Sequence, residues 1–215
     1  MSGIRSERDG LMKIKHVLLF AAFSVLSVLI SGCGTGKPDS SAGTPDTGSA
    51  SSGSAVNISV TSDSLTSDGK WLTAICSTRA NPPGFNLSPQ LSWDRVDGAE
   101  CYAVYMVDNS AGYWLHWIAK NVKETELPTG AELEESSYIG PYPPSGTHEY
   151  EVIVYALKKA PEKYPGTFDS NSVSLSMIES ELDTAGGVSG NIIGKGSIKG
   201  TVTVGETVVQ TSAEQ

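Results

Sequence analysis

The segment Glu100–Asp108 constrains the fold more than any other part of the sequence. Its alternating side chains are apolar on both faces: one set is Cys101, Ala103, Tyr105 and Val107, and the other is Tyr102, Val104 and Met106. A strand that is apolar on both faces lies in the interior of a sheet, where other layers cover it. The segment therefore predicts a central strand.

Other segments extend this β pattern. His148–Leu157 is rich in Val, Ile and Tyr, and Trp114–Val122 follows the first strand after the short polar turn Asn109–Tyr113. So short a connection predicts an antiparallel pair. With 23 Gly and 11 Pro, the chain is expected to be mainly β. Weaker candidates are strands at Asn57–Thr61, Trp71–Ser77, Gln90–Trp93 and Gly200–Val204, and one short helix at Ser174–Leu182.

Polar side chains gather at one end of this predicted sheet. Asp108 ends the first strand, and His116 lies near the start of its antiparallel partner. His148 and Tyr150 are two residues apart, so they project from the same face of their strand. Both histidines begin strands beside Pro- and Gly-rich loops. We therefore expect a site that contains the two histidines, the aspartate and the tyrosine.

The motifs resemble the phosphatidylethanolamine-binding protein family, also called Raf kinase inhibitor-like proteins, and particularly its bacterial branch. The resemblance runs through Asn86–Trp93 (NLSPQLSW), Asp108 and Trp114–Trp117 (WLHW). It ends with Gly140–Tyr150 (GPYPPSGTHEY), which is similar to the family signature GP-x-PP-x-G-x-HRY.

The resemblance implies a sandwich of two antiparallel sheets with short C-terminal helical elements. It also implies an anion pocket at one end of the large sheet, formed by Asp108, His116, His148 and Tyr150, with Pro143 and Pro144 at the rim. The implied ligand is a phosphate-like or phosphorylethanolamine-like small anion. Family members are often inhibitors of peptidases or kinases, so a protein partner of that kind is a further expectation.

The sequence departs from the family pattern at two places. The family usually has Asp-Pro-Asp-Ala-Pro after the first strand, whereas this chain has Asp108–Gly112 (DNSAG). The usual Arg after the second histidine is Glu149. The first change predicts a less rigid and less acidic loop. The second removes a positive charge, although strand alternation turns Glu149 away from His148.

The N-terminal region has the layout of an export signal. A basic stretch, Met12–His16, precedes the apolar run Val17–Ile30, whose 14 residues are too few to span a bilayer comfortably. Ile30–Cys33 resembles the bacterial lipobox, in which cleavage precedes a cysteine that carries diacylglycerol. The following Ser/Gly-rich stretch through residue 55 is a flexible linker. We expect a signal peptide at 1–32, lipidated Cys33, a linker at 33–55, and one domain at 56–215 anchored to the cell envelope.

Composition weighs against several other functions. A net charge of −9 argues against nucleic-acid binding. No serine stands in a nucleophile-elbow motif, and no glycine-rich phosphate loop is present, so we expect neither catalysis nor a cofactor. Two histidines and one carboxylate can ligate a metal, but three Cys and three His give no familiar zinc spacing.

Two alternatives stay open at this point. After lipidation of Cys33, the remaining Cys76 and Cys101 form either a disulfide or two buried free thiols. The segment Leu91–Tyr105 also resembles the B–C strand region of a fibronectin type III module, a type of adhesion or interaction domain. That interpretation leaves Gly140–Tyr150 unexplained and needs only about 100 residues.

Overall fold

The computed structural model describes residues 55–210. The predicted signal peptide, Cys33 and the predicted linker up to residue 54 lie outside the described residues. Within residues 55–210, no helix has the length and apolar character needed to cross a membrane.

The described residues form two β-sheets. The larger sheet has six strands, and all of its pairings are antiparallel except the one between β1 and β9. Its order is β1 (Val56–Asn57), β9 (Ile192–Thr203), β8 (Thr147–Leu157), β4 (Cys101–Asp108), β5 (Trp114–Val122) and β7 (Ser136–Tyr138). The smaller antiparallel sheet has the order β2 (Val60–Thr61), β3 (Leu91–Trp93) and β6 (Glu126–Leu127). The predicted mainly β fold with two sheets is confirmed.

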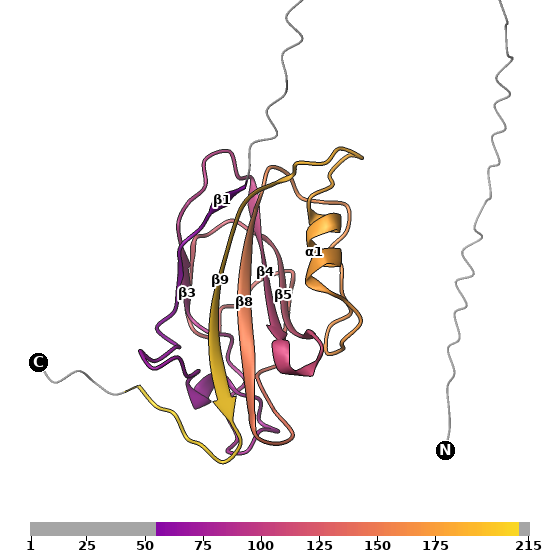
Figure 1. Ribbon diagram of the computed structural model, residues 1–215. Helices are drawn as coiled ribbons and strands as arrows, with labels where there is room; N and C mark the ends of the chain where they lie inside the picture. The colour runs from indigo at the N-terminus through magenta and orange to yellow at the C-terminus, as the bar shows by residue number, and fades with distance from the viewer. Residues whose placement is uncertain (1–54, 211–215) are drawn as a thin grey trace, which may run out of the picture. The chain divides into compact units, whose positions relative to one another are not determined.

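Strand β4 lies in the middle of the large sheet, as its two apolar faces predicted (Figure 1). All of its residues are buried, and it pairs with β5 on one side and β8 on the other. The register with β8 runs from Cys101 opposite Leu157 to Asp108 opposite Tyr150. This register brings Asp108 and the start of β8 to the same end of the sheet.

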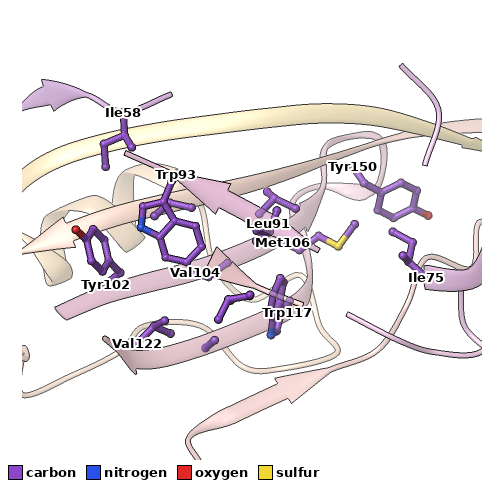
Figure 2. Close-up of a cluster of buried hydrophobic side chains, with 14 of the residues drawn as sticks. Ile58, Ile75, Leu91, Trp93, Tyr102, Val104, Met106, Trp117, Val122 and Tyr150 are labelled. Atoms are coloured by element: carbon purple, nitrogen blue, oxygen red, sulfur yellow. The ribbon is translucent and has the colours of Figure 1, made fainter. Parts of the chain in front are cut away.

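Each face of the large sheet has its own hydrophobic core. One core lies between the two sheets and contains Trp93, Val104, Met106, Trp117 and Val154, among others (Figure 2). The other core lies beneath helix α1 (Leu175–Leu182), which covers the opposite face of the large sheet (Figure 1). The alternating side chains of β4 divide between these two cores, so burial on both faces fixes the strand in place.

The predicted helix at Ser174–Leu182 is confirmed. Ser174 is its N-cap, and the Ser174 hydroxyl accepts a hydrogen bond from the Met177 amide at 3.3 Å. Ile178 and Leu182 are fully buried against the sheet. Two 3-10 helices complete the helical elements of residues 55–210: η1 (Thr73–Ile75) and η2 (Asn109–Ala111).

Three of the weaker strand predictions need correction. Trp71–Ser77 is not a strand: after an isolated bridge at Trp71 it turns into η1, which inserts the fully buried Ile75 into the core. Asn57–Thr61 divides into β1 and β2, which belong to different sheets. The predicted strand Gly200–Val204 overlaps only the end of the much longer β9, which stops at Thr203 and whose glycines weaken the strand pattern. One of them, Gly196, is required because a Cβ there would lie 2.0 Å from the Ile58 carbonyl oxygen.

Cys76 and Cys101 are both buried free thiols, so the structure contains the thiols and not the disulfide. Cys101 belongs to the core beneath α1. Cys76 directly follows Ile75, which belongs to the core between the sheets. Burial chiefly raises the pKa values of Tyr138 and Tyr150, which pack in that same core, and the nearby Cys76 raises them further, so the two thiols lie on opposite faces of the large sheet. Burial raises the pKa of the Cys76 thiol to about 11.

Candidate functional site

A cavity of about 570 Å³ opens at the end of the large sheet where β4 stops and β5 and β8 begin. All six residues that the sequence predicted for the pocket line it: Asp108, His116, Pro143, Pro144, His148 and Tyr150. The other lining residues are Arg79, Asn81, Ala111, Trp114, Tyr142 and Val204. Of the four tryptophans, Trp114 forms part of this wall, while Trp71, Trp93 and Trp117 are buried in the core between the sheets.

A β-bulge aims His116 into the cavity. Val107 pairs with Leu115 and Met106 pairs with Trp117, so His116 is an extra residue on β5. Leu115 packs in the core beneath α1, and Trp117 packs in the core between the sheets. Because of the bulge, His116 and Trp117 both face the side of the sheet on which the cavity lies. Simple alternation along the strand does not predict this bulge.

Asp108 and His148 form the tightest polar contact of the cavity. His148 Nδ1 donates to Asp108 Oδ2 at 2.6 Å, and Asp108 Oδ1 accepts from the Ser110 amide at 2.8 Å. The Asp108 side chain is almost completely buried, and that of His148 is 15% exposed. Since Nδ1 is engaged, Nε2 is the nitrogen of His148 that remains for a ligand.

His116 has a different partner. Its Nδ1 lies 2.9 Å from the Ile139 carbonyl oxygen, which can only accept, so Nδ1 carries a proton. Burial lowers the pKa of His116 below the ordinary 6.5, and this influence outweighs the opposing hydrogen bond to Ile139. The negative charges of Asp108 and Asp169 also oppose it. At neutral pH the ring is therefore uncharged, and its Nε2 accepts hydrogen bonds until an anion stabilises the protonated form.

The Tyr150 hydroxyl is buried and lies close to the Asp108 carboxylate, but it makes no hydrogen bond of ordinary geometry with any described residue. The ring packs edge-on against His116, with centroids 5.2 Å apart, and is stacked with His148. Figure 2 shows the hydroxyl at the end of the ring that points away from Leu91 and Met106. Burial, followed by the charge of Asp108, raises the pKa of Tyr150 far above the normal range. The hydroxyl therefore remains protonated and is an unused donor at the cavity.

Sequence reasoning missed a second polar group at the rim, formed by Arg79, Tyr142 and Asp169. The Arg79 guanidinium carbon lies 4.6 Å from the centre of the Tyr142 ring, and Arg79 Nη2 lies 3.8 Å from Asp169 Oδ2. Tyr142 lies inside the predicted Gly140–Tyr150 motif, so its position was available from the sequence. Arg79 and Asp169 lie in irregular loops outside every motif, and no sequence signal singles them out.

The two predicted motifs hold each other in place. The Asn86 side chain accepts a hydrogen bond from the Gly140 amide at 2.8 Å, although Asn86 and Gly140 are far apart in sequence. A Cβ at Gly140 would lie 2.1 Å from the Ile75 carbonyl oxygen, so the close approach of this segment to the end of η1 also requires glycine. This contact fixes the start of the segment that carries Tyr142, Pro143 and Pro144 to the rim.

The sequence departs from the family pattern in the loop Asp108–Gly112 and at Glu149, and these two places contact each other. Asn109 Nδ2 donates to Glu149 Oε1 at 2.8 Å and to Glu151 Oε2 at 3.1 Å. The Glu149 amide donates to the Ser110 hydroxyl at 3.0 Å, and Lys199 pairs with both glutamates. Glu149 thus faces away from His148, as alternation predicted. These contacts constrain the loop after β4 where the family pattern has prolines.

The charges in the cavity and directly beside its rim are almost balanced. Asp108 is hydrogen-bonded to His148, and Asp169 is paired with Arg79. Arg79 is the only Arg or Lys that lines the cavity within residues 55–210. The same part of the chain contains no cluster of three or more His, Cys, Asp or Glu arranged to hold a metal ion. This arrangement of charges and donors suits a small ligand that accepts hydrogen bonds from the Tyr150 hydroxyl and the Arg79 guanidinium.

Residues 61–202 match the family model described as phosphatidylethanolamine-binding protein. The chain belongs to the phosphatidylethanolamine-binding protein family. The match includes both the Leu91–Tyr105 segment and the Gly140–Tyr150 motif, and the fibronectin type III alternative finds no support.

Proteins similar to this chain are found among archaea and bacteria. A UPF0098 protein of Methanothermobacter thermautotrophicus is 35% identical over 103 residues, which cover 39% of this chain and 68% of the relative. The crystal structure of E. coli YbcL, described as a new member of the mammalian PEBP family, has a TM-score of 0.53 and 26% identity. That match covers 68% of this chain and 98% of YbcL.

A second solved structure supports the fold alone. It is a phosphatidylethanolamine-binding protein homologue from Chlamydia trachomatis, with a TM-score of 0.50 and 22% identity. The match covers 68% of this chain and 97% of that chain.

Proposed function

We propose that this protein is a non-enzymatic binding protein whose cavity takes a small phosphate-like anion. The observation that carries the proposal is the Tyr150 hydroxyl, which is buried at the cavity without a hydrogen-bond partner among the described residues. An unsatisfied buried donor is costly for the ligand-free protein, about 1–3 kcal/mol, and an anion oxygen would satisfy it. His116 Nε2 and His148 Nε2 are the further ring nitrogens that remain for the same ligand.

The cavity chemistry supports binding over catalysis. In the described part of the chain, none of the residues that line the cavity is Ser, Thr or Cys, the usual nucleophiles of hydrolases. Its apolar wall, formed by Trp114, Pro143, Pro144 and Val204, leaves room for a small organic group attached to the anion. Phosphorylethanolamine is therefore the first organic ligand to test, beside inorganic phosphate.

The test is a histidine-resolved NMR titration of the purified full-length protein with inorganic phosphate and with phosphorylethanolamine. His116→Ala and His148→Ala variants assign the two imidazole signals. The proposal expects both rings to shift together, with one saturation curve, and each variant to weaken the response of the other ring. If neither ring responds between pH 5 and 8, the cavity is not an anion site.

We further propose that an acyl group on Cys33 holds the domain at the cell envelope. The proposal rests on the lipobox-like sequence Ile30–Cys33 and the Ser/Gly-rich stretch that follows it. Mass spectrometry of the mature N-terminal peptide tests it, because the diacylglyceryl group adds a defined mass to Cys33. Cys33→Ser should release the protein from the membrane fraction. An unmodified cysteine in the wild-type peptide would contradict the anchor.

A further inference from the structure

Arg79 lies at the rim of the cavity without being fixed there. Its side chain is 58% exposed, its guanidinium is stacked over Tyr142, and its ion pair with Asp169 spans 3.8 Å. Exposed ion pairs of this kind contribute little to stability, so Arg79 can leave Asp169 at small cost. A guanidinium that is free to turn can form paired hydrogen bonds to a phosphate group.

Asp169 is held much more firmly than Arg79. Its Oδ1 accepts hydrogen bonds from the Tyr142 hydroxyl at 2.8 Å and from Trp114 Nε1 at 3.1 Å. The Asp169 amide donates to the Leu115 carbonyl at 3.0 Å, which ties the residue to β5. Its backbone has a φ of +56°, a conformation that few non-glycine residues adopt. Asp169 is thus a fixed carboxylate whose second oxygen, Oδ2, faces Arg79.

We propose that Asp169 holds Arg79 back from the anion site in the ligand-free protein, and that Arg79 moves from Asp169 to the anion when a ligand binds. The inference rests on the proposed function of the cavity. It adds a preference for a doubly charged phosphate monoester over a singly charged phosphodiester.

The charge arrangement explains this preference. Asp169 competes with the ligand for one guanidinium, so the ligand must attract Arg79 more strongly than a fixed carboxylate does. A monoester, with nearly two negative charges at neutral pH, meets this condition better than a diester with one charge. No other Arg or Lys lines the cavity within the described part of the chain. The preference therefore depends on Arg79.

The experiment measures the Kd of phosphorylethanolamine, a monoester, and of glycerophosphorylethanolamine, a diester, by calorimetry at pH 7.5. It uses the full-length wild-type protein, Arg79→Gln, Asp169→Asn and the double variant. Asn keeps the Oδ1 acceptor for Tyr142 and Trp114 while removing the charge. Lys120→Gln is the matched control, because Lys120 lies 5.6 Å over the Tyr164 ring and does not line the cavity.

The wild type should bind the monoester about tenfold more tightly than the diester, a difference of about 1.4 kcal/mol. Arg79→Gln should bring the two affinities within about twofold of each other, since the remaining donors respond less to the second charge. Asp169→Asn should tighten monoester binding several-fold, and this gain should vanish in the double variant. Lys120→Gln should leave both affinities unchanged.

Three results would overturn the inference. If Arg79→Gln keeps the wild-type preference, Arg79 does not contact the ligand, and the anion site stands without it. If Asp169→Asn weakens binding whether or not Arg79 is present, Asp169 supports the cavity wall and does not hold Arg79 back. If the wild type binds neither compound, the proposed function itself fails. Melting temperatures of all variants, measured without ligand, show that each one is folded.

Discussion

Replacing Tyr150 by Phe should make the ligand-free protein more stable while weakening anion binding. The Tyr150 side chain is fully buried, and its hydroxyl has no hydrogen-bond partner within residues 55–210. Removing an unsatisfied buried hydroxyl relieves a cost of about 1–3 kcal/mol, and the ring that fills the site remains. We expect a gain of about 1 kcal/mol in the free energy of unfolding. For a domain of this size the melting temperature should rise by about 2–4 °C.

The same substitution removes a donor to the bound anion. A hydrogen bond to a charged group contributes about 1.5–3 kcal/mol, so the Kd for phosphate should rise by about ten- to a hundredfold. Thermal unfolding with and without phosphate measures both effects at once. The ligand-free melting temperature rises, and the additional increase caused by phosphate becomes smaller.

Tyr155 provides a matched control on the same strand. Its hydroxyl is also buried without a partner in the described chain, but its ring packs in the core beneath α1, on the opposite face of the sheet from the cavity. Tyr155→Phe should therefore stabilise the protein by a similar amount and leave phosphate binding unchanged. The reasoning is refuted if Tyr150→Phe destabilises the ligand-free protein by more than 1 kcal/mol. It is also refuted if phosphate binds the Tyr150→Phe variant as tightly as it binds the wild type.

Three further predictions concern pH, the loop after β4 and the close approach of Gly140 to η1. Sulfate does not titrate between pH 5 and 8, so it should bind more tightly as pH falls toward the lowered pKa of His116. Calorimetry at a series of pH values measures this change in Kd, and the change should be smaller in His116→Gln. The pKa of His116 is lower in the folded protein than in the unfolded chain, so His116 should make the ligand-free protein less stable as pH falls below 6.5. A free energy of unfolding that rises below pH 6.5 would contradict the burial of His116 in its neutral form. The variants Asn109→Ala and Glu149→Ala should each weaken phosphate binding. In a double-mutant cycle, the loss in the double variant should be smaller than the sum of the two single losses. Additive losses would show that the 2.8 Å contact between Asn109 and Glu149 does not support the loop. Gly140→Ala should lower the free energy of unfolding in urea by more than about 3 kcal/mol, because its Cβ would lie 2.1 Å from the Ile75 oxygen, and a neutral effect would contradict that close approach.

The central strands could be predicted because their sequence pattern is local. Glu100–Asp108 is apolar on both faces, and such a segment is stable only between two layers, which is where β4 lies. The boundaries of Trp114–Val122 agree with β5, and the antiparallel pairing follows from the short turn between them. The first half of β9 was missed because its glycines fit closely against Ile58 and Val96, and this fit is visible only in three dimensions.

The candidate site divides in the same way. Strand alternation placed His148 and Tyr150 on one face, but they meet Asp108 because β8 pairs with β4. The sequence implied that convergence only through the family resemblance. Arg79 and Asp169 come from loops with no periodic pattern, and the bulge that turns His116 depends on pairing that the sequence does not reveal. The sequence therefore predicted Asp108, His148 and Tyr150 in the cavity but did not predict the ion pair between Arg79 and Asp169 at its rim.

The most direct test of the central claim is a crystal structure of the protein grown with phosphorylethanolamine. The account predicts a phosphate group in the cavity, with oxygen atoms about 2.5–3.2 Å from Tyr150 Oη, His116 Nε2 and His148 Nε2. A cavity that holds only water at saturating ligand, or a phosphate group bound elsewhere while Tyr150 Oη stays unpaired, would contradict it.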